Sequence, residues 1–206
     1  MAHEPHMVSL GFTKQSFPAG VHICQIFSND EERLDSLLEF LRSGLAAGEK
    51  TACFTEKLDD AHLADYLADH DLSCDKLKES GALMKAGTSE VYFQDDRFDP
   101  DRMLGMLQQF HEDSVASGYP AARVIGEMTS EIESIDGGSR LMEYESRVSL
   151  LLKEHPVTAV CQYDANTFDG KTIMQVLKVH PLMVIRGAVV HNPYYVPPEE
   201  VLANQS

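Results

Sequence analysis

The stretch from residue 21 to residue 55 restricts the fold more than any other part of the chain. The apolar run Val21–Phe27 predicts a strand, leucines at helical spacing over residues 34–45 predict a helix, and Thr51–Thr55 predicts a second strand. The turn before the helix, residues 28–32, is acidic and contains no glycine. A phosphate loop needs glycines for close backbone approach and a lysine for the terminal phosphates. The unit therefore has the form of a nucleotide-binding fold without its phosphate chemistry.

The rest of the chain continues this alternation of strands and helices. Further strands are predicted over residues 82–86, 123–128, 157–163, 182–186 and 188–190, and helices over 58–70, 99–117, 139–154 and 170–179. Most strands are nearly continuous apolar runs, which indicates burial on both faces. We therefore expect a three-layer α/β fold, with helices on both faces of a mainly parallel central sheet.

The length and punctuation of the chain predict one domain with short ends. We assign residues 19–202 to a single domain, because 206 residues with 43% hydrophobic content suit one well-buried core. Residues 1–18 form an N-terminal lead-in, which is either loose or a weakly docked strand. Residues 91–97 are expected to form a long loop. The proline-rich segment 192–198 is expected to lie extended, and 203–206 to form a C-terminal tail.

Charge and cysteine usage exclude several classes of protein. With 17 basic and 33 acidic residues, the formal net charge is -16, so direct binding to nucleic acid or an anionic membrane surface is not expected. An acidic surface does suit a basic protein partner. There is no apolar run near the length of a membrane span and no secretory leader. The four cysteines are scattered without a CxxC pair, a cytoplasmic pattern.

Candidate binding residues are found by asking what each strand places at its carboxyl end, where ligands sit in open parallel sheets. We expect a polar lining in which His22 and Glu127 orient a polar group, while thiols and Tyr163 pack beside it. The full predicted set is His22, Cys24, Glu127, Cys161, Tyr163 and His180. The basis is the expected convergence of these side chains in the fold.

Three chemical alternatives compete with this set. His22 and Cys24 lie two apart on a strand and share a face, so with Cys161 or His180 they could form a zinc or copper site. No pair has a recognised metal spacing, so no metal or other cofactor is predicted. No glycine-rich nucleophile turn accompanies a Cys–His pair, so no enzyme is predicted. Glu127 is either a water-activating acid or a carboxylate neutralised by a nearby arginine or backbone group.

Short motifs in consistent order carry a resemblance to a known family. They are Gly20–Cys24, Gly44–Lys50, Tyr119 with Arg123–Met128, Tyr144-Glu145, Cys161–Tyr163, His180-Pro181 and Asn192–Pro198. Together they resemble the MEDS domain, the methanogen/methylotroph DcmR sensory domain, over roughly residues 17–202. The segment Met128-Thr129-Ser130 departs from the family, where an aromatic residue is expected soon after this strand.

The resemblance implies a sensory module that binds small hydrocarbon derivatives, such as halogenated or oxygenated compounds of one to a few carbons. It also implies a fold similar to the RecA- and KaiC-like ATPases that lacks the phosphate loop. Members are usually joined to a DNA-binding or histidine-kinase output. Neither a helix-turn-helix nor a kinase is visible in these 206 residues. We therefore expect signalling through a separate partner, a histidine kinase or a transcription regulator.

The sequence leads to one preferred function and two alternatives. The preferred function is a non-catalytic, cytoplasmic sensor that binds a small organic ligand. The second is a ligand-free regulator that binds its partner through the acidic surface. The third is a protein with residual nucleotide binding. The oligomeric state, a homodimer included, stays open.

Overall fold

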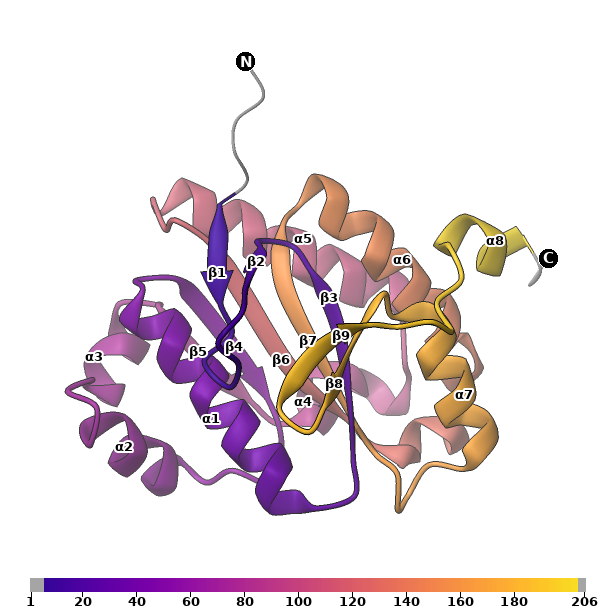
Figure 1. Cartoon of the computed structure of the whole chain (residues 1–206), viewed down its shortest axis with the longest axis horizontal. Helices are drawn as coiled ribbons and strands as arrows, with labels where there is room; N and C mark the ends of the chain where they lie inside the picture. The colour runs from indigo at the N-terminus through magenta and orange to yellow at the C-terminus, as the bar shows by residue number, and fades with distance from the viewer. Residues whose placement is uncertain (1–5, 204–206) are drawn as a thin grey trace.

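A seven-stranded sheet forms the centre of the computed structural model, which describes residues 6–203 (Figure 1). The strand order is β5-β4-β6-β7-β3-β8-β9, and all neighbours are parallel except the hairpin of β8 and β9. The strands are β3 (His22–Phe27), β4 (Lys50–Phe54), β5 (Leu83–Ala86), β6 (Ala122–Met128), β7 (Val157–Asp164), β8 (Leu182–Ile185) and β9 (Ala188–His191). The mainly parallel α/β sheet expected from the sequence is confirmed.

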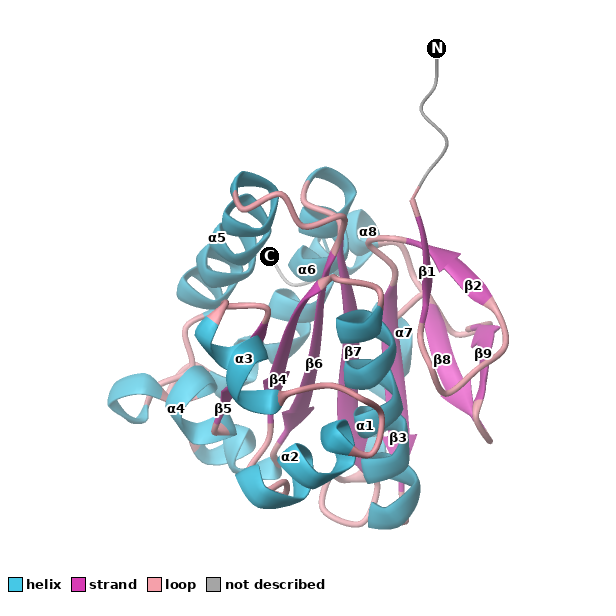
Figure 2. Cartoon of the chain, turned by 90° about the vertical axis from the view of Figure 1, so that its left-hand side faces the viewer, coloured by secondary structure: helices cyan, strands magenta, loops and turns pink. Residues whose placement is uncertain are grey.

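Helices cover both faces of this sheet (Figure 2). One face, the α1 face, carries α1 (Asp30–Ala46), α2 (Asp60–Ala68) and α3 (Cys74–Glu79). The other, the α6 face, carries α4 (Thr88–Tyr92), α5 (Pro100–Ala116), α6 (Leu141–Glu154) and α7 (Gly170–Val179), while α8 (Pro198–Ala203) packs on α6. Short 3₁₀ segments are Gln94–Asp96, Ser130–Ser134 and Gly138–Arg140. No helix in the described chain is long and apolar enough to cross a bilayer.

Side-chain alternation along the strands divides the core in two. In β3, Cys24 packs in the core under α6, whereas its neighbour Ile23 packs in the core under α1. Helices cover both cores, so β3 is buried along most of its length. Polar side chains on such strands must find partners inside the protein, because water is excluded. This alternation decides which predicted site residues can meet.

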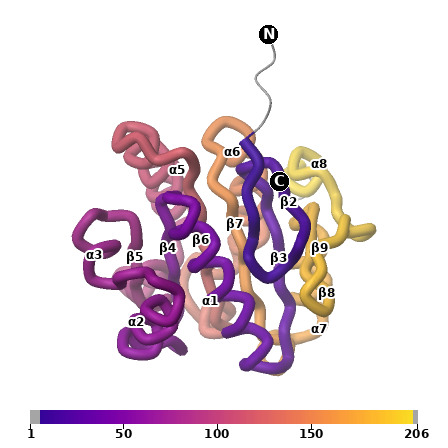
Figure 3. The backbone as a smooth tube through the Cα atoms, turned by 60° about the vertical axis from the view of Figure 1, so that its left-hand side comes forward, coloured from indigo at the N-terminus to yellow at the C-terminus, as the bar shows by residue number. Residues whose placement is uncertain are grey.

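An N-terminal hairpin docks on the α1 face, where the sequence predicted either a loose lead-in or a weakly docked strand. Its strands β1 (Met7–Ser9) and β2 (Ser16–Pro18) pair antiparallel, and the following Leu10 is fully buried in the α1-side core. Figure 3 shows this indigo hairpin on the side of the sheet that carries α1. Of the two options for the lead-in, residues 7–18 therefore form a docked element. Residues 1–5 of that lead-in lie outside the described residues.

Two other segments differ from the sequence expectation. Val91 and Tyr92 end helix α4 instead of starting the loop expected over residues 91–97, because both side chains pack into the core beside β6. A single turn is too short to show helical periodicity, so only tertiary contact reveals it. At the C-terminus, Ala203 belongs to α8 instead of a tail. The remaining tail residues, 204–206, lie outside the described part.

Candidate functional site

A buried group of polar side chains surrounds Glu145 on the α6 face; we call it the Glu145 cluster. Glu145 comes from α6 and is fully buried. The Tyr163 hydroxyl donates to its Oε1. Its Oε2 lies 3.2 Å from His22 Nε2, 3.5 Å from His180 Nε2 and 3.7 Å from Cys161 Sγ. Side chains from β3, β7 and the turn after α7 thus meet at a single carboxylate on α6.

Each imidazole of the cluster is fixed by a bond at its other nitrogen. His22 Nδ1 lies 2.8 Å from Ser149 Oγ, and His180 Nδ1 lies 2.8 Å from the Val176 carbonyl oxygen. The Asn192 amide donates to the backbone carbonyl of His180 at 2.8 Å. The two rings are tilted against each other, with centroids 4.2 Å apart. Both rings therefore present Nε2 to Glu145.

Burial and mutual charge set the protonation states. Burial lowers the pKa of His22 to about 4, and the charge of His180 adds to this effect. Burial would raise the pKa of Glu145, but His180 and His22 outweigh it and hold that pKa well below its usual range. Burial, reinforced by the Glu145 charge, raises the pKa of both Cys161 and Tyr163. At neutral pH the cluster is thus built around an ionised carboxylate.

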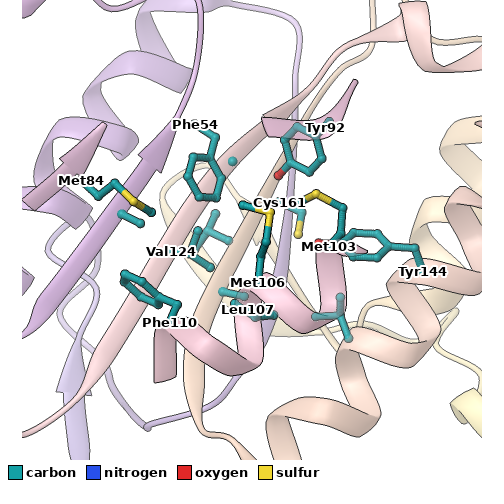
Figure 4. A pocket seen from close by; sticks show the side chains of 15 residues that line it. Phe54, Met84, Tyr92, Met103, Met106, Leu107, Phe110, Val124, Tyr144 and Cys161 are labelled. Atoms are coloured by element: carbon teal, nitrogen blue, oxygen red, sulfur yellow. The ribbon is translucent and has the colours of Figure 1, made fainter. Parts of the chain in front are cut away.

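An apolar cavity of about 60 Å³ lies beside the cluster, between the sheet, α5 and α6 (Figure 4). Apolar and sulfur-containing side chains make most of its wall, among them Phe54, Met103, Leu107, Phe110, Val124 and Val148. Figure 4 shows the Cys161 thiol and the Tyr92 hydroxyl among these side chains. Cys161 therefore belongs both to the cavity wall and to the Glu145 cluster.

A surface groove adjoins the cavity at the edge of the sheet. Met84 of β5 and Met106 and Phe110 of α5 line both the cavity and the groove. Met84 is 40% exposed and Met106 is 38% exposed, so these two side chains separate the cavity from solvent. Methionine side chains are unbranched and change rotamer easily. The pair therefore forms a thin, flexible wall between the cavity and the groove.

A family model described as "MEDS: MEthanogen/methylotroph, DcmR Sensory domain" matches residues 21–181. The chain belongs to the MEDS family. It is also 26% identical, over 160 residues, to the transcriptional repressor DcmR of Methylorubrum extorquens (strain DSM 6343 / CIP 106787 / DM4). That alignment covers 77% of this chain but 57% of the repressor. The chain thus spans little more than half the length of this curated relative.

Solved structures with a similar fold support the expected architecture of this MEDS chain. A KaiC-like protein, PH0186, from Pyrococcus horikoshii OT3 has a TM-score of 0.61 at 14% identity, covering 87% of this chain and 80% of its own. The flagellar accessory protein FlaH from Methanocaldococcus jannaschii has a TM-score of 0.59 at 12% identity, covering 90% and 84%. At such low identity the likeness shows the fold alone, and it confirms the KaiC-like expectation.

Four of the sequence-predicted site residues meet in this MEDS domain. His22, Cys161, Tyr163 and His180 all contact Glu145. Cys24 lies on the same sheet face, in register with Cys161, but has no contact with the carboxylate in the described structure. The cluster is also placed differently from the expectation. His22 opens β3 and Cys161 lies in the middle of β7, so the site is under α6 and not beyond the carboxyl ends of the strands.

Glu127 is not brought to the others, because strand alternation turns it to the α1 face. Its carboxylate accepts from Thr55 Oγ1 at 2.9 Å and pairs with Lys57 Nζ at 2.7 Å, while Arg33 Nη1 lies 3.9 Å away. Lys57 Nζ is also 3.7 Å from Asp30 at the start of α1. Of the two roles left open for Glu127, the geometry matches a neutralised carboxylate. Internal ion pairs occupy the end of the sheet where a phosphate loop would act.

Glu145 and Ser149 are site residues outside the set predicted from the sequence. Both lie in the predicted helix 139–154, four residues apart and therefore on one face. Leu141, Val148 and Leu152 on that helix are buried as well. A carboxylate on the apolar face of a helix must find internal partners when that face packs on a sheet. The position of Glu145 on the apolar face of this helix was therefore the sequence feature that could have identified it as a site residue.

Proposed function

We propose that this chain is a non-catalytic sensory domain that binds a small, mainly apolar organic molecule in the cavity beneath α5 and α6. The observation that carries the proposal is an apolar cavity of about 60 Å³ with Cys161 in its wall. Membership of a sensory-domain family supports the same class of function. Cavities with apolar walls and few polar groups are typical of small-molecule sites.

The size of the cavity selects the size of the ligand. One water-sized sphere occupies about 10–15 Å³ by this measure. A cavity of about 60 Å³ thus accommodates a molecule of about four to six non-hydrogen atoms. A halogenated or oxygenated compound of one to a few carbons has this size. The Cys161 thiol and the Tyr92 hydroxyl are the groups available to a polar atom of such a ligand.

The energetics of the cavity favour occupation. Leaving 60 Å³ unfilled costs about 1.4 kcal/mol at about 24 cal/mol per Å³. A ligand that fills the space restores the missing dispersion contacts of the wall. Binding rather than catalysis is favoured by the thiols, because burial raises the pKa of Cys24 to about 12 and raises that of Cys161 too. A protonated thiol is a poor nucleophile.

Thermal unfolding with dichloromethane, dibromomethane, ethanol and acetone tests the proposal. A ligand at ten times its Kd stabilises the folded state by about 1.4 kcal/mol, which in a domain of this size raises Tm by about 3–6 °C. We expect such a rise with at least one of these compounds. Failure of every compound to raise Tm, up to the concentration at which it denatures the protein, would contradict the proposal.

A cavity-filling variant shows where the ligand binds. Ala52 lies in β4 and lines the cavity, so Ala52→Val adds two methyl groups inside it. The exposed strand residue Ala188 in β9 provides the same chemical change away from the cavity. We expect Ala52→Val to fold and to lose the ligand-induced rise in Tm, and Ala188→Val to keep it. Equal rises in both variants would place binding elsewhere.

The output step of the proposal is a protein partner, a histidine kinase or a transcription regulator. The support is that the relative is named a transcriptional repressor, together with the acidic surface expected from a net charge of -16. Pull-down from a source lysate with and without the stabilising compound tests it. Recovery of one such regulator with a ligand-dependent yield is the expected result. A partner bound equally by wild type and Ala52→Val, with no ligand effect, would favour the ligand-free regulator instead.

A further inference from the structure

The Glu145 cluster contains a set of donor atoms arranged for a metal ion. His22, Glu145, Cys161 and His180 each offer one ligand atom, and these atoms lie within 4.8 Å of one another. They come from β3, α6, β7 and the turn after α7, so the convergence is produced by the fold and not by neighbouring sequence. We propose that this cluster binds one divalent transition-metal ion of the zinc class.

The distances match tetrahedral coordination. Ligand atoms about 2.0–2.3 Å from a tetrahedral zinc ion lie about 3.3–3.6 Å from each other. Glu145 Oε2 is 3.2 Å from His22 Nε2, 3.5 Å from His180 Nε2 and 3.7 Å from Cys161 Sγ. Cys161 Sγ is 3.5 Å from His22 Nε2. Four of the six donor–donor distances are thus close to the edge lengths of a coordination tetrahedron, and the other two are within 4.8 Å.

The outer nitrogens of both imidazoles are held as metal-binding histidines require. The Val176 carbonyl can only accept a hydrogen bond, so His180 carries its proton on Nδ1. Ser149 Oγ lies 3.4 Å from the Val179 carbonyl and donates to it, which leaves the hydroxyl as an acceptor for His22 Nδ1. With Nδ1 bonded elsewhere, each ring directs Nε2 toward the carboxylate, as a metal ligand would. Such outer hydrogen bonds fix the orientation of metal ligands.

One buried nitrogen of the cluster is left without a hydrogen bond. His180 Nε2 is buried and makes no hydrogen bond in the described structure. Two ring nitrogens face one carboxylate oxygen, and buried polar groups of this kind are costly unless a proton or a cation lies between them. A proton can satisfy one N–O contact at a time. A metal ion satisfies all four donors at once, and it binds the sulfur as a thiolate, with the thiol proton released to solvent.

The donor types select the metal. Two imidazoles, one thiolate and one carboxylate form a mixed nitrogen, sulfur and oxygen set that zinc accepts readily. Magnesium and calcium require oxygen ligands and are excluded by the same chemistry. Cobalt(II) adopts the same geometry and gives a visible spectrum, so it is the probe of choice. Because Cys161 also lines the apolar cavity, the bound ion would lie one side chain away from it.

Metal analysis and cobalt spectroscopy on the full chain test the site. We expect the protein expressed with zinc to retain about one equivalent after gel filtration, and the metal-depleted protein to bind cobalt(II) with a thiolate charge-transfer band. Wild-type protein that retains no zinc and leaves the cobalt spectrum unchanged would overturn the proposal in favour of a proton. This measurement needs no variant, and it is independent of ligand binding in the cavity.

Two cysteine variants assign the spectrum. Cys161→Ser removes a proposed ligand, whereas Cys24→Ser changes the thiol beside it in the sheet register and leaves the donor set intact. We expect the charge-transfer band to disappear in Cys161→Ser and to persist in Cys24→Ser, with both variants folded by circular dichroism. His22→Gln should weaken zinc retention at least tenfold. A band that survives Cys161→Ser or requires Cys24 would overturn the assignment.

Discussion

Arg123 of β6 is a fully buried cation whose partners connect three parts of the molecule. Its Nε donates to Glu49 Oε2 at 2.6 Å, and its Nη1 donates to the Ser9 and Phe40 carbonyls at 2.9 and 3.1 Å. The hydrogen bond to Ser9 holds the N-terminal hairpin against α1. A buried ion pair contributes little in net terms when intact, but removing one partner leaves an uncompensated charge.

We therefore expect Glu49→Gln to lower the free energy of unfolding by about 3–5 kcal/mol, as measured by urea denaturation. Glu199→Gln is the matched control. Glu199 pairs with Lys153 on the surface, where both side chains are more than half exposed, so no measurable change is expected there. Equal stability of the two variants would mean that Glu49 is not needed to balance Arg123.

At the scale of elements, a glycine in helix α1 allows the helix to pack closely against Arg123. Gly44 lies inside α1, and a Cβ atom there would be 2.9 Å from Cζ of Arg123. Glycine inside a helix normally costs about 1 kcal/mol relative to alanine. Here the missing side chain makes room for the buried guanidinium, so close packing outweighs helix propensity.

Substitution of two helical glycines separates these effects. Gly44→Ala should lower the free energy of unfolding by about 1–2 kcal/mol, because overpacking exceeds the gain in propensity. Gly105→Ala in α5, where the added Cβ meets no atom within 4 Å, should raise it by about 0.5–1 kcal/mol. Chemical denaturation measures both. Stabilisation by Gly44→Ala would show that α1 can move away from Arg123.

The elements that periodicity predicted are those long enough to show it. The helix starting at Asp99-Pro100 and the buried strands were visible because the capping signal and the apolar runs are local properties. The single-turn helix α4 was not visible, and the hairpin β1–β2 was left open between a loose lead-in and a docked strand, since tertiary burial of Tyr92 and Leu10 stabilises them. Local sequence carries no information on such contacts.

The candidate site was predictable in part for the same reason. His22, Cys161, Tyr163 and His180 were found because the strand or turn that carries each was found. Glu127 was placed with them because it ends a predicted strand, but alternation along β6 turns its side chain to the opposite face of the sheet. Glu145 was missed because its partners, unlike its helix, cannot be read from spacing.

At the scale of the whole molecule, the chain keeps a KaiC-like fold and closes the end of the sheet where phosphate loops act. The turn after β3 has no glycine, and α1 starts with three acidic residues. Glu127 is already paired with Lys57, and the formal net charge is -16. Each feature disfavours a triphosphate. The apolar cavity and the Glu145 cluster lie on the opposite, α6 face.

ATP and GTP should therefore give no thermal protection, with or without magnesium. Thermal unfolding at millimolar nucleotide measures this, since a ligand that binds the folded state must raise Tm. A compound that does raise Tm through the cavity serves as the positive control in the same plate. A magnesium-dependent rise with ATP would restore the nucleotide-binding alternative.

The most direct test of the account is a crystal soaked with dibromomethane and measured at the bromine absorption edge. A compound of this size fits a cavity of about 60 Å³. We expect anomalous bromine peaks inside the cavity, between Cys161 and α5, in wild-type crystals, and their loss in Ala52→Val. Bromine peaks only on the outer surface, or none at all in a well-diffracting soaked crystal, would contradict a sensory site beneath α5 and α6.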